Sequence, residues 1–364
     1  MVKAKRLIPI FPPRQATTLS GALAQYTPLV TKKLLCYTNP PTPAWMMANT
    51  ATMDAAPVDG VVVILPLSTG GYFHTYNFSQ TTIPYSALES SLSSIKAAQS
   101  LLTNCVNNIP LLNVRPGVQD WFDDDWNAAI VANFGTIARF CANAGLPGFL
   151  FDSEEYQGDV WVLEDLPTYP AYSAAAHEAA VYAVGYAAGA AIKLNYPDCK
   201  VFTVTTPINT TLIYNFFNGM LNAMAEGETD DRFDMVFGYE SYGAKTAHDF
   251  QNIVDYYYAL EYFGGVIPDE ITSNWYSRRS IFLASAPAGA AATWDHNDFD
   301  NNFMTPAVYK TAIEQTLLQA HEYAWTYLNP ITLFTVQDGY VNLLDPEYIL
   351  AIKSARATLE MRVW

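Results

Sequence analysis

The sequence predicts an α/β fold, a (β/α)8 TIM barrel that makes up a single domain. Short apolar runs rich in β-branched residues alternate with alanine-rich amphipathic stretches, and eight strand-like runs occur in turn. Strands that alternate with helices of this length are typical of parallel βα units. The strands are almost continuously apolar, which indicates a sheet covered on both faces. Eight such units in a chain of 364 residues fit a barrel with insertions.

Eight segments have the composition of buried strands. Each joins apolar and β-branched residues and runs into a polar or aromatic loop. In chain order they are Leu34–Asn39, Val58–Pro66, Ile109–Pro116, Gly148–Tyr156, Val201–Pro207, Asp234–Tyr242, Ser280–Ala286 and Tyr323–Asn329.

Helical periodicity occupies most of the sequence between these strands. Gly145 is placed to end one helix, and Pro306 and Pro346 suit the first helical position, with Asp345 as an N-cap before Pro346. The expected helices are Ser86–Leu102, Trp126–Ala144, Ser173–Asn195, Leu212–Ala225, Ala247–Phe263, Pro306–Glu322 and Pro346–Arg362.

A doubly wound open sheet is the alternative architecture. Its nucleotide-binding versions are disfavoured, because no GxGxxG follows the first strand and GxxxxGK[ST] is absent. We expect residues 1–30 to form an N-terminal extension packed on the barrel, and residues 31–364 to form the catalytic barrel itself.

Composition argues against several classes of protein. With 51% hydrophobic and 15% charged residues, the chain can form a large core. A formal net charge of -16 gives no electrostatic basis for binding nucleic acid or an anionic membrane. No apolar run reaches the roughly 18 residues that cross a bilayer. The four cysteines form no CxxC pair, which favours buried free thiols.

The chain begins with MVKAKRLIPIFPPRQ, in which prolines interrupt a short apolar stretch after a basic start. This is a poor signal peptide. We therefore expect a secreted or periplasmic location if a native signal was removed, and a cytoplasmic one otherwise. The sequence does not indicate the oligomeric state.

The chemistry is expected at the carboxyl ends of the strands, because the active site of a (β/α)8 barrel lies there. Carboxylates and aromatic rings gather at these positions, whereas GxSxG and HExxH motifs are absent. Rings of Tyr and Trp offer an apolar face with a polar tip, which suits a sugar. The residues expected to bind substrate are Tyr37, Asn39, Arg115, Asp120, Trp121, Tyr156, Tyr239, Tyr242, Trp294 and Trp325.

The fourth strand carries the main catalytic candidates. Its period of two places Asp152 and Glu154 on one face, and two close carboxylates raise each other's tendency to hold a proton. This favours Glu154 as a general acid with Asp152 beneath it, and Glu155 is the alternative acid. The competing interpretation is structural, with Asp152 paired to Arg115 and the two glutamates solvated.

Glu240, at the end of the sixth strand, is the second candidate carboxylate. Gly238 before it is expected to leave room for a ligand or a bulge. Tyr239 and Tyr242 are candidates for contacting the substrate or stabilising an intermediate. Trp325 in the eighth strand is a candidate for the floor of a sugar subsite, against the alternative of a plain core tryptophan.

The segment FLFDSE at 149–154 resembles the fourth-strand signature of the chitinase-like glycoside hydrolases of family 18, which ends in Asp-x-Glu. Met235–Tyr239 followed by Glu240 is similar to the sixth-strand motif of that family, and Trp325 to its eighth-strand tryptophan. The resemblance implies that Glu154 is the general acid and that Asp152 helps a substrate acetamido group to act as nucleophile. Leu150 stands where the family has a further Asp, so we assign a glycosidase-type barrel without a specific family.

The sequence thus predicts a glycoside hydrolase that cleaves a poly- or oligosaccharide by carboxylate general acid/base catalysis in an aromatic-lined cleft. We expect the catalytic groups among Glu154, Glu240, Asp152 and Glu155, a carbohydrate as the partner, and neither a cofactor nor a metal. Two alternatives stay open. One is a non-catalytic carbohydrate-binding barrel, and the other is a metal-dependent lyase or hydrolase with Asp120, Asp152, Glu154 and Glu240 as oxygen ligands.

Overall fold

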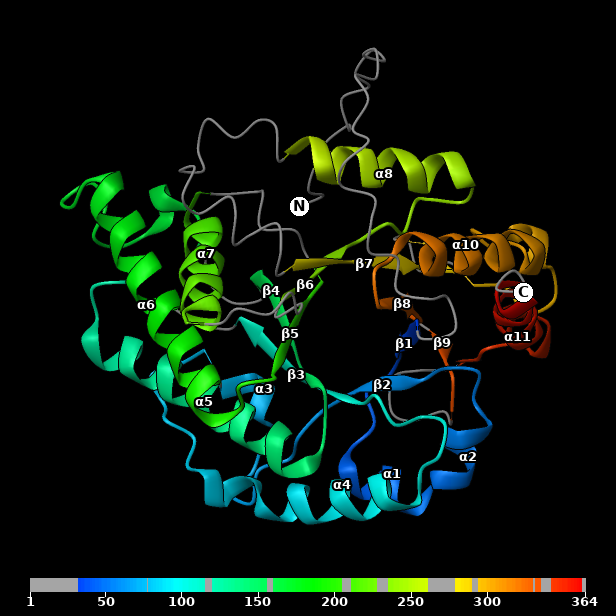
Figure 1. Cartoon of the computed structure of the whole chain (residues 1–364), viewed down its shortest axis with the longest axis horizontal. Coiled ribbons are helices and arrows are strands. Elements are labelled where there is room, and N and C mark those ends of the chain that lie inside the picture. Colours follow the sequence, from blue (N-terminus) through cyan, green and yellow to red (C-terminus); the bar gives the residue numbers. More distant parts are fainter. Residues whose placement is uncertain are drawn as a thin grey trace.

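A computed structural model describes residues 32–76, 78–114, 120–155, 160–204, 211–227, 235–260, 279–289, 294–329, 331–334 and 342–361. Eight parallel strands follow one another round a closed barrel in chain order, and the last strand pairs with the first (Figure 1). Helices surround this barrel. The closure confirms the (β/α)8 barrel over a doubly wound open sheet, which would leave two strand edges.

Every strand expected from the sequence overlaps an observed one. A short additional sheet of two parallel strands, β9 (Ile331–Thr332) and β10 (Asn342–Leu343), follows the barrel and was not predicted. The barrel strands are β1 (Lys33–Tyr37), β2 (Gly60–Val63), β3 (Ile109–Val114), β4 (Gly148–Glu155), β5 (Lys200–Thr203), β6 (Met235–Tyr239), β7 (Arg279–Ser285) and β8 (Tyr323–Tyr327).

The helix ends follow the local sequence. Gly145 adopts a left-handed conformation with φ 69° and ends its helix, as predicted. Pro306 begins a helix after the capping residue Thr305, and Pro346 begins another. Three short helices after β1 and β2 were not predicted. The helices are α1 (Pro43–Ala48), α2 (Thr50–Ala55), α3 (Phe73–Tyr76), α4 (Glu89–Leu101), α5 (Asp124–Ala144), α6 (Ala174–Asn195), α7 (Thr211–Ala225), α8 (Ala247–Leu260), α10 (Pro306–Gln319) and α11 (Pro346–Met361).

Side chains divide into an inner and an outer core. On β4, Leu150 packs inside the barrel with residues such as Phe202 and Trp325. Its neighbours Phe149 and Phe151 belong to the larger cluster between the barrel and the helices. This alternation follows the period of two of a strand. The face of β4 that carries Leu150 therefore lines the inside of the barrel.

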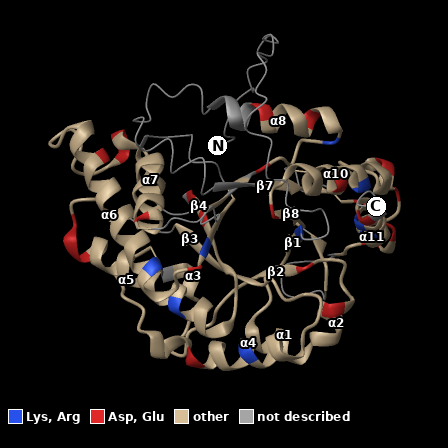
Figure 2. Ribbon diagram, in the orientation of Figure 1, with Lys and Arg blue, Asp and Glu red and all other residues tan. Residues whose placement is uncertain are grey.

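The places of the charged residues, the hydropathy of the helices and the state of the cysteines agree with what the composition predicts. Figure 2 shows charged residues on the outer helices and loops, and an acidic segment at the end of β4 inside the ring of helices. Among the described residues, no helix is both long and apolar enough to cross a membrane. All four cysteines are buried and free, as predicted.

Candidate active site

The end of β4 is irregular, and Glu154 lies in the irregularity. Asn113 of β3 pairs with Asp152, but the next residue of β3, Val114, pairs with Glu155. Ser153 and Glu154 are thus inserted between the paired positions, as in a β-bulge. Bulges of this kind re-aim side chains and are common next to active sites.

Asp152 is 1% exposed and accepts hydrogen bonds from Asn113 and from the backbone of Glu154. Its Oδ2 accepts from the side-chain amide of Asn113 at 3.0 Å, and its Oδ1 accepts from the backbone N–H of Glu154 at 3.1 Å. Buried carboxylates are costly unless they are satisfied in this way. These bonds make Asp152 a support for the backbone of Glu154.

Glu240 follows β6, and its pKa is raised to about 7. The largest cause is desolvation by the many protein atoms around it, although Glu240 itself is exposed to solvent. The second cause is the charge of Glu154, which disfavours a second negative charge nearby. The carboxylates of β4 and β6 are therefore close enough to interact. A hydrogen bond from Tyr242 opposes both effects.

The Tyr242 phenol lies between Glu240 and the rings of β8. Burial, the negative charge of Glu240 and the hydrogen bond to it all raise the pKa of Tyr242, so the phenol keeps its proton and donates a hydrogen bond to the carboxylate. Its ring stacks on Tyr327, with centroids 5.0 Å apart and an interplanar angle of 19°. It also meets the Trp325 ring at 5.7 Å in an edge-on arrangement.

The backbone around Glu240 is fixed by close contacts with both neighbouring strands. A Cβ added to Gly238 would lie 1.8 Å from the carbonyl oxygen of Thr203 on β5. The absent side chain therefore makes room for β5, which corrects the expectation of space for a ligand or a bulge. On the other side, the hydroxyl of Ser241 donates to the Ala284 carbonyl of β7 at 2.5 Å and accepts from the Ala284 N–H at 2.9 Å.

Trp325 forms the centre of an aromatic cluster at the inner end of this site. It is 1% exposed and stacks on Phe282, with centroids 5.6 Å apart. Tyr37 from β1 lies 6.2 Å away. The indole Nε1 of Trp325 is buried and has no hydrogen-bond partner in the described structure. A buried donor without an acceptor costs free energy.

Trp121 lies in the cluster between the barrel and the helices. It is 1% exposed, its indole N–H donates to the carbonyl of Val160 at 2.7 Å, and its ring packs against Trp126 and Trp161. The ring thus belongs to the outer core, between the barrel and the helices. Its contact with substrate stays a prediction.

Asp120 connects two loops. One of its oxygens accepts from the N–H of Phe122 at 3.0 Å, and the other accepts from the N–H and the hydroxyl of Thr168 at 3.0 and 2.6 Å. Both oxygens are thereby used to hold the loop after β3 against the loop after β4. Binding of substrate by Asp120 stays a prediction.

The remaining predicted residues are only partly placed. Trp294 is partly exposed and packs on Tyr348, with centroids 4.6 Å apart, and Asn39 is partly exposed just after β1. Their contact with substrate stays a prediction. Four further predictions lie outside the described residues or side chains, namely Arg115, Tyr156 and the side chains of Glu155 and Tyr239.

Two residues of the site were missed as candidates. Asn113 interrupts an apolar strand just where β3 meets the acidic end of β4. Tyr327 lies two positions after Trp325, so the period of two places both on one face of β8. A polar residue inside an apolar strand and a repeat of two between aromatic rings are the signals that could have identified them.

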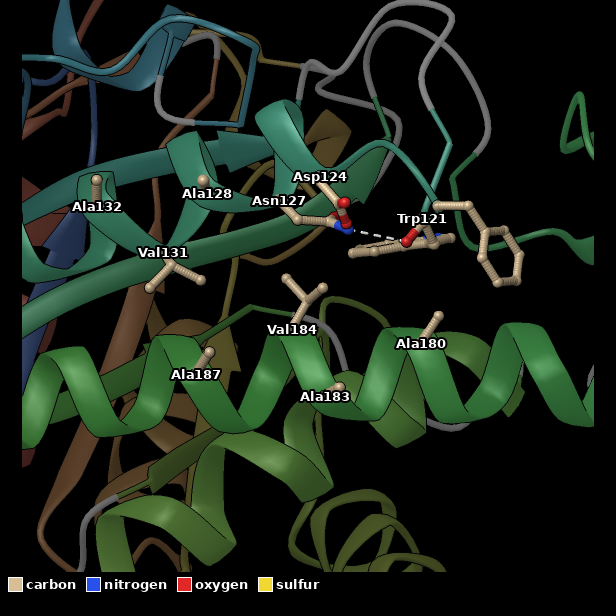
Figure 3. Close-up of a pocket in the computed structure, with 11 residues that line it drawn as sticks. Trp121, Asp124, Asn127, Ala128, Val131, Ala132, Ala180, Ala183, Val184 and Ala187 are labelled. Carbon is tan, nitrogen blue, oxygen red and sulfur yellow. Dashed lines mark hydrogen bonds between the residues drawn. The ribbon is translucent and has the colours of Figure 1, made fainter.

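Features elsewhere lie apart from these carboxylates. A groove of about 600 Å³ runs between α5 and α6 on the outside of the barrel, and alanines such as Ala128 and Ala183 line it together with Trp121 and Phe122 (Figure 3). No group of three or more His, Cys, Asp or Glu side chains suited to a metal ion occurs within the described residues.

Neither a family model nor a curated protein matches the sequence. Glycoside hydrolases with barrel folds are among the solved structures to which the chain is similar. A glucosidase from Croceicoccus marinus is 13% identical, with 90% of this chain and 68% of that chain covered and a TM-score of 0.48. A family 5 glycoside hydrolase from Prevotella bryantii, solved with a xyloglucan tetradecasaccharide, is 12% identical, with 87% and 86% covered and a TM-score of 0.46. A thermostable chitinase from Pyrococcus furiosus is 11% identical, with 91% and 97% covered and a TM-score of 0.46.

Proposed function

We propose that this protein is a glycoside hydrolase in which Glu240 is the general acid and Glu154 is the second catalytic carboxylate. One observation carries the proposal. Carboxylates from β4 and β6 interact at the carboxyl ends of the barrel strands, and the pKa of one of them, Glu240, is raised to about 7. Two carboxylates with separate proton affinities are what acid-assisted glycoside cleavage requires.

The roles follow from the surroundings of each group. Glu240 holds a proton near neutral pH and would give it to the glycosidic oxygen as the bond to the anomeric carbon breaks. Glu154 would attack that carbon or take a proton from the attacking water, and the distance between the carboxylates decides which. Asp152 would keep the Glu154 backbone in place. The acid is thus Glu240, whereas the sequence alone favours Glu154.

The aromatic cluster supports a carbohydrate as the substrate. Tyr37 and Tyr242 are partly exposed and combine ring faces with polar tips, as sugar-binding sites do, and both pack on the buried ring of Trp325. We propose a poly- or oligosaccharide bound in a cleft that these rings line.

A panel of neutral and N-acetylated glycans tests the proposal, with new reducing ends as the readout. We expect cleavage of at least one glycan, undiminished by a chelator. Binding without any product after long incubation would instead support a non-catalytic carbohydrate-binding barrel. Activity lost on chelation and restored by Mg²⁺ or Mn²⁺ would support the metal-dependent alternative.

The pH dependence of cleavage provides a first quantitative prediction. Because Glu240 must be protonated to act as the acid, kcat/KM should fall as the pH rises through about 7. Tyr242→Phe removes a hydrogen bond that lowers the pKa of Glu240, so this descending limb should move to higher pH. Initial rates measured from pH 4 to 10 check both statements. A limb that stays in place in Tyr242→Phe would contradict the assignment of Glu240.

A further inference from the structure

Tyr327 has no part in the reaction described so far, yet a hydrogen bond and several aromatic rings hold it in place. The side-chain amide of Asn329 donates to its hydroxyl at 2.9 Å. The ring of Tyr37 meets it edge-on at 5.6 Å and 76°. The ring of Trp325 lies 6.1 Å away in an edge-on arrangement, and the ring of Tyr242 stacks on its face. A ring held this firmly can serve as a fixed surface for its neighbour.

The segment from Glu240 to Tyr242 reaches across one strand to meet Tyr327. It starts at the end of β6, passes β7, where Ser241 exchanges two hydrogen bonds with Ala284, and brings the Tyr242 ring onto β8. Ser241 fixes the backbone of this segment. The face of Tyr327 fixes the direction of the Tyr242 side chain, whose hydroxyl donates to Glu240.

We propose that Tyr327 is a positioning residue for Glu240 and acts on it through the stacked ring of Tyr242. The inference rests on the proposed function, since it takes Glu240 as the general acid. Without the face of Tyr327, the phenol of Tyr242 could rotate away from the carboxylate. Glu240 would then lose both its orientation and the hydrogen bond that favours its charged form.

The titratable groups that bear on this contact lie on three strands or their loops. Glu240, Tyr327 and Glu154 all act electrostatically on Tyr242, and Glu154 also acts on Glu240. Removing the Tyr327 ring leaves both carboxylates in place. A change in the titration of Glu240 in that variant would therefore report the loss of the Tyr242 contact.

The test compares Tyr327→Leu, which removes the stacking face, with Tyr327→Phe, which keeps the face and removes only the hydroxyl. In Tyr327→Leu we expect kcat to fall about tenfold or more, because a displaced catalytic group can cost up to about 10²-fold. KM should change little, and the descending limb of the pH profile should move to higher pH. Tyr327→Phe should stay close to wild type. Tyr186→Leu, on α6 outside the barrel, where the ring stacks on Tyr182, is the matched control.

A double variant separates positioning from direct contact with a sugar. If Tyr327 acts through Tyr242, then Tyr327→Leu combined with Tyr242→Phe should be no worse than Tyr242→Phe alone. A raised KM with an unmoved pH limb, and effects that add in the double variant, would overturn the proposal and make Tyr327 a substrate contact. If Tyr327→Leu does not fold, Tyr327→Met removes the ring at similar volume and takes its place in both comparisons.

A readout without substrate keeps this inference separate from the proposed function. The carboxyl ¹³C signal of Glu240, assigned by its disappearance in Glu240→Gln, can be titrated in wild type and in Tyr327→Leu. We expect a higher midpoint in Tyr327→Leu even if no glycan is ever cleaved. Equal midpoints would refute the positioning role while leaving the glycosidase assignment intact.

Discussion

Replacing Glu240 with glutamine is expected to lower kcat by about 10²–10⁴-fold, and Glu154→Gln should do the same. General acid or base groups contribute factors of this size, and glutamine keeps the shape of the side chain while it removes the ionisable proton. The two carboxylates come from different strands and interact across the site. Neither carboxylate can take over the role of the other, so each single substitution should by itself lower kcat to this extent.

Substrates with different leaving groups tell the two roles apart. In an aryl glycoside with an acidic phenol, the phenolate leaves without taking up a proton. Glu240→Gln should therefore retain far more activity on this substrate than on a natural glycan. Glu154→Gln should be inactive on both. Glu164→Gln, the same change at an exposed glutamate of the loop after β4, should match wild type. Rates within about tenfold of wild type in both active-site variants would contradict the assignment.

Thermal unfolding of Glu240→Gln at two pH values tests whether its loss of activity is caused by a loss of fold. The folded-state pKa of Glu240 is raised, so its stabilising contribution is complete below about pH 4.5 and is lost as the pH rises through about 7. Glutamine resembles the protonated acid at every pH. Glu240→Gln should therefore have a higher Tm than wild type at pH 8 and a similar Tm at pH 4.

Trp121→Ala is expected to reduce the free energy of unfolding by about 3–5 kcal/mol, the usual cost of removing a large ring from a core. Trp121 is 1% exposed, and its ring touches Phe78, Trp126, Trp161 and Phe216. The substitution also removes the donor to the Val160 carbonyl, which is then left unsatisfied. Urea unfolding monitored by far-UV circular dichroism measures the loss.

Trp294→Ala is the matched control, since this tryptophan is partly exposed and packs mainly on Tyr348. Its cost in stability should be clearly smaller. Below the unfolding transition, Trp121→Ala should bind glycans with the KM of wild type. An increase in KM of the fully folded variant would show that Trp121 contacts substrate, as the sequence predicts.

The architecture was predictable because it depends on patterns that the sequence repeats. Continuous apolar runs such as those of β3 and β4 are buried on two faces, and helical periodicity between them leaves few other arrangements. The place of Glu240 beyond the end of β6 followed from the same reasoning. Its proton affinity did not, because that depends on protein atoms and charges brought from other strands.

Trp121 and Trp325 show why ring identity alone could not locate the site. Both follow or lie in a strand, and both are almost fully buried, one in the outer core and one inside the barrel. The difference is decided by whether a loop folds back onto the helices, as the loop at Trp121 does. Likewise, the two-residue insertion that contains Glu154 depends on how β3 pairs with β4, which no local pattern encodes.

The tight contacts at Gly238 and Ser241 limit how this protein can diversify. A side chain at Gly238 would collide with β5, and a loss of the Ser241 hydroxyl would leave two backbone groups of Ala284 unsatisfied. Substitutions here would harm the fold before they altered selectivity. New substrate preferences should therefore arise by variation in the loops after other strands, while the segment that carries Glu240 is inherited unchanged.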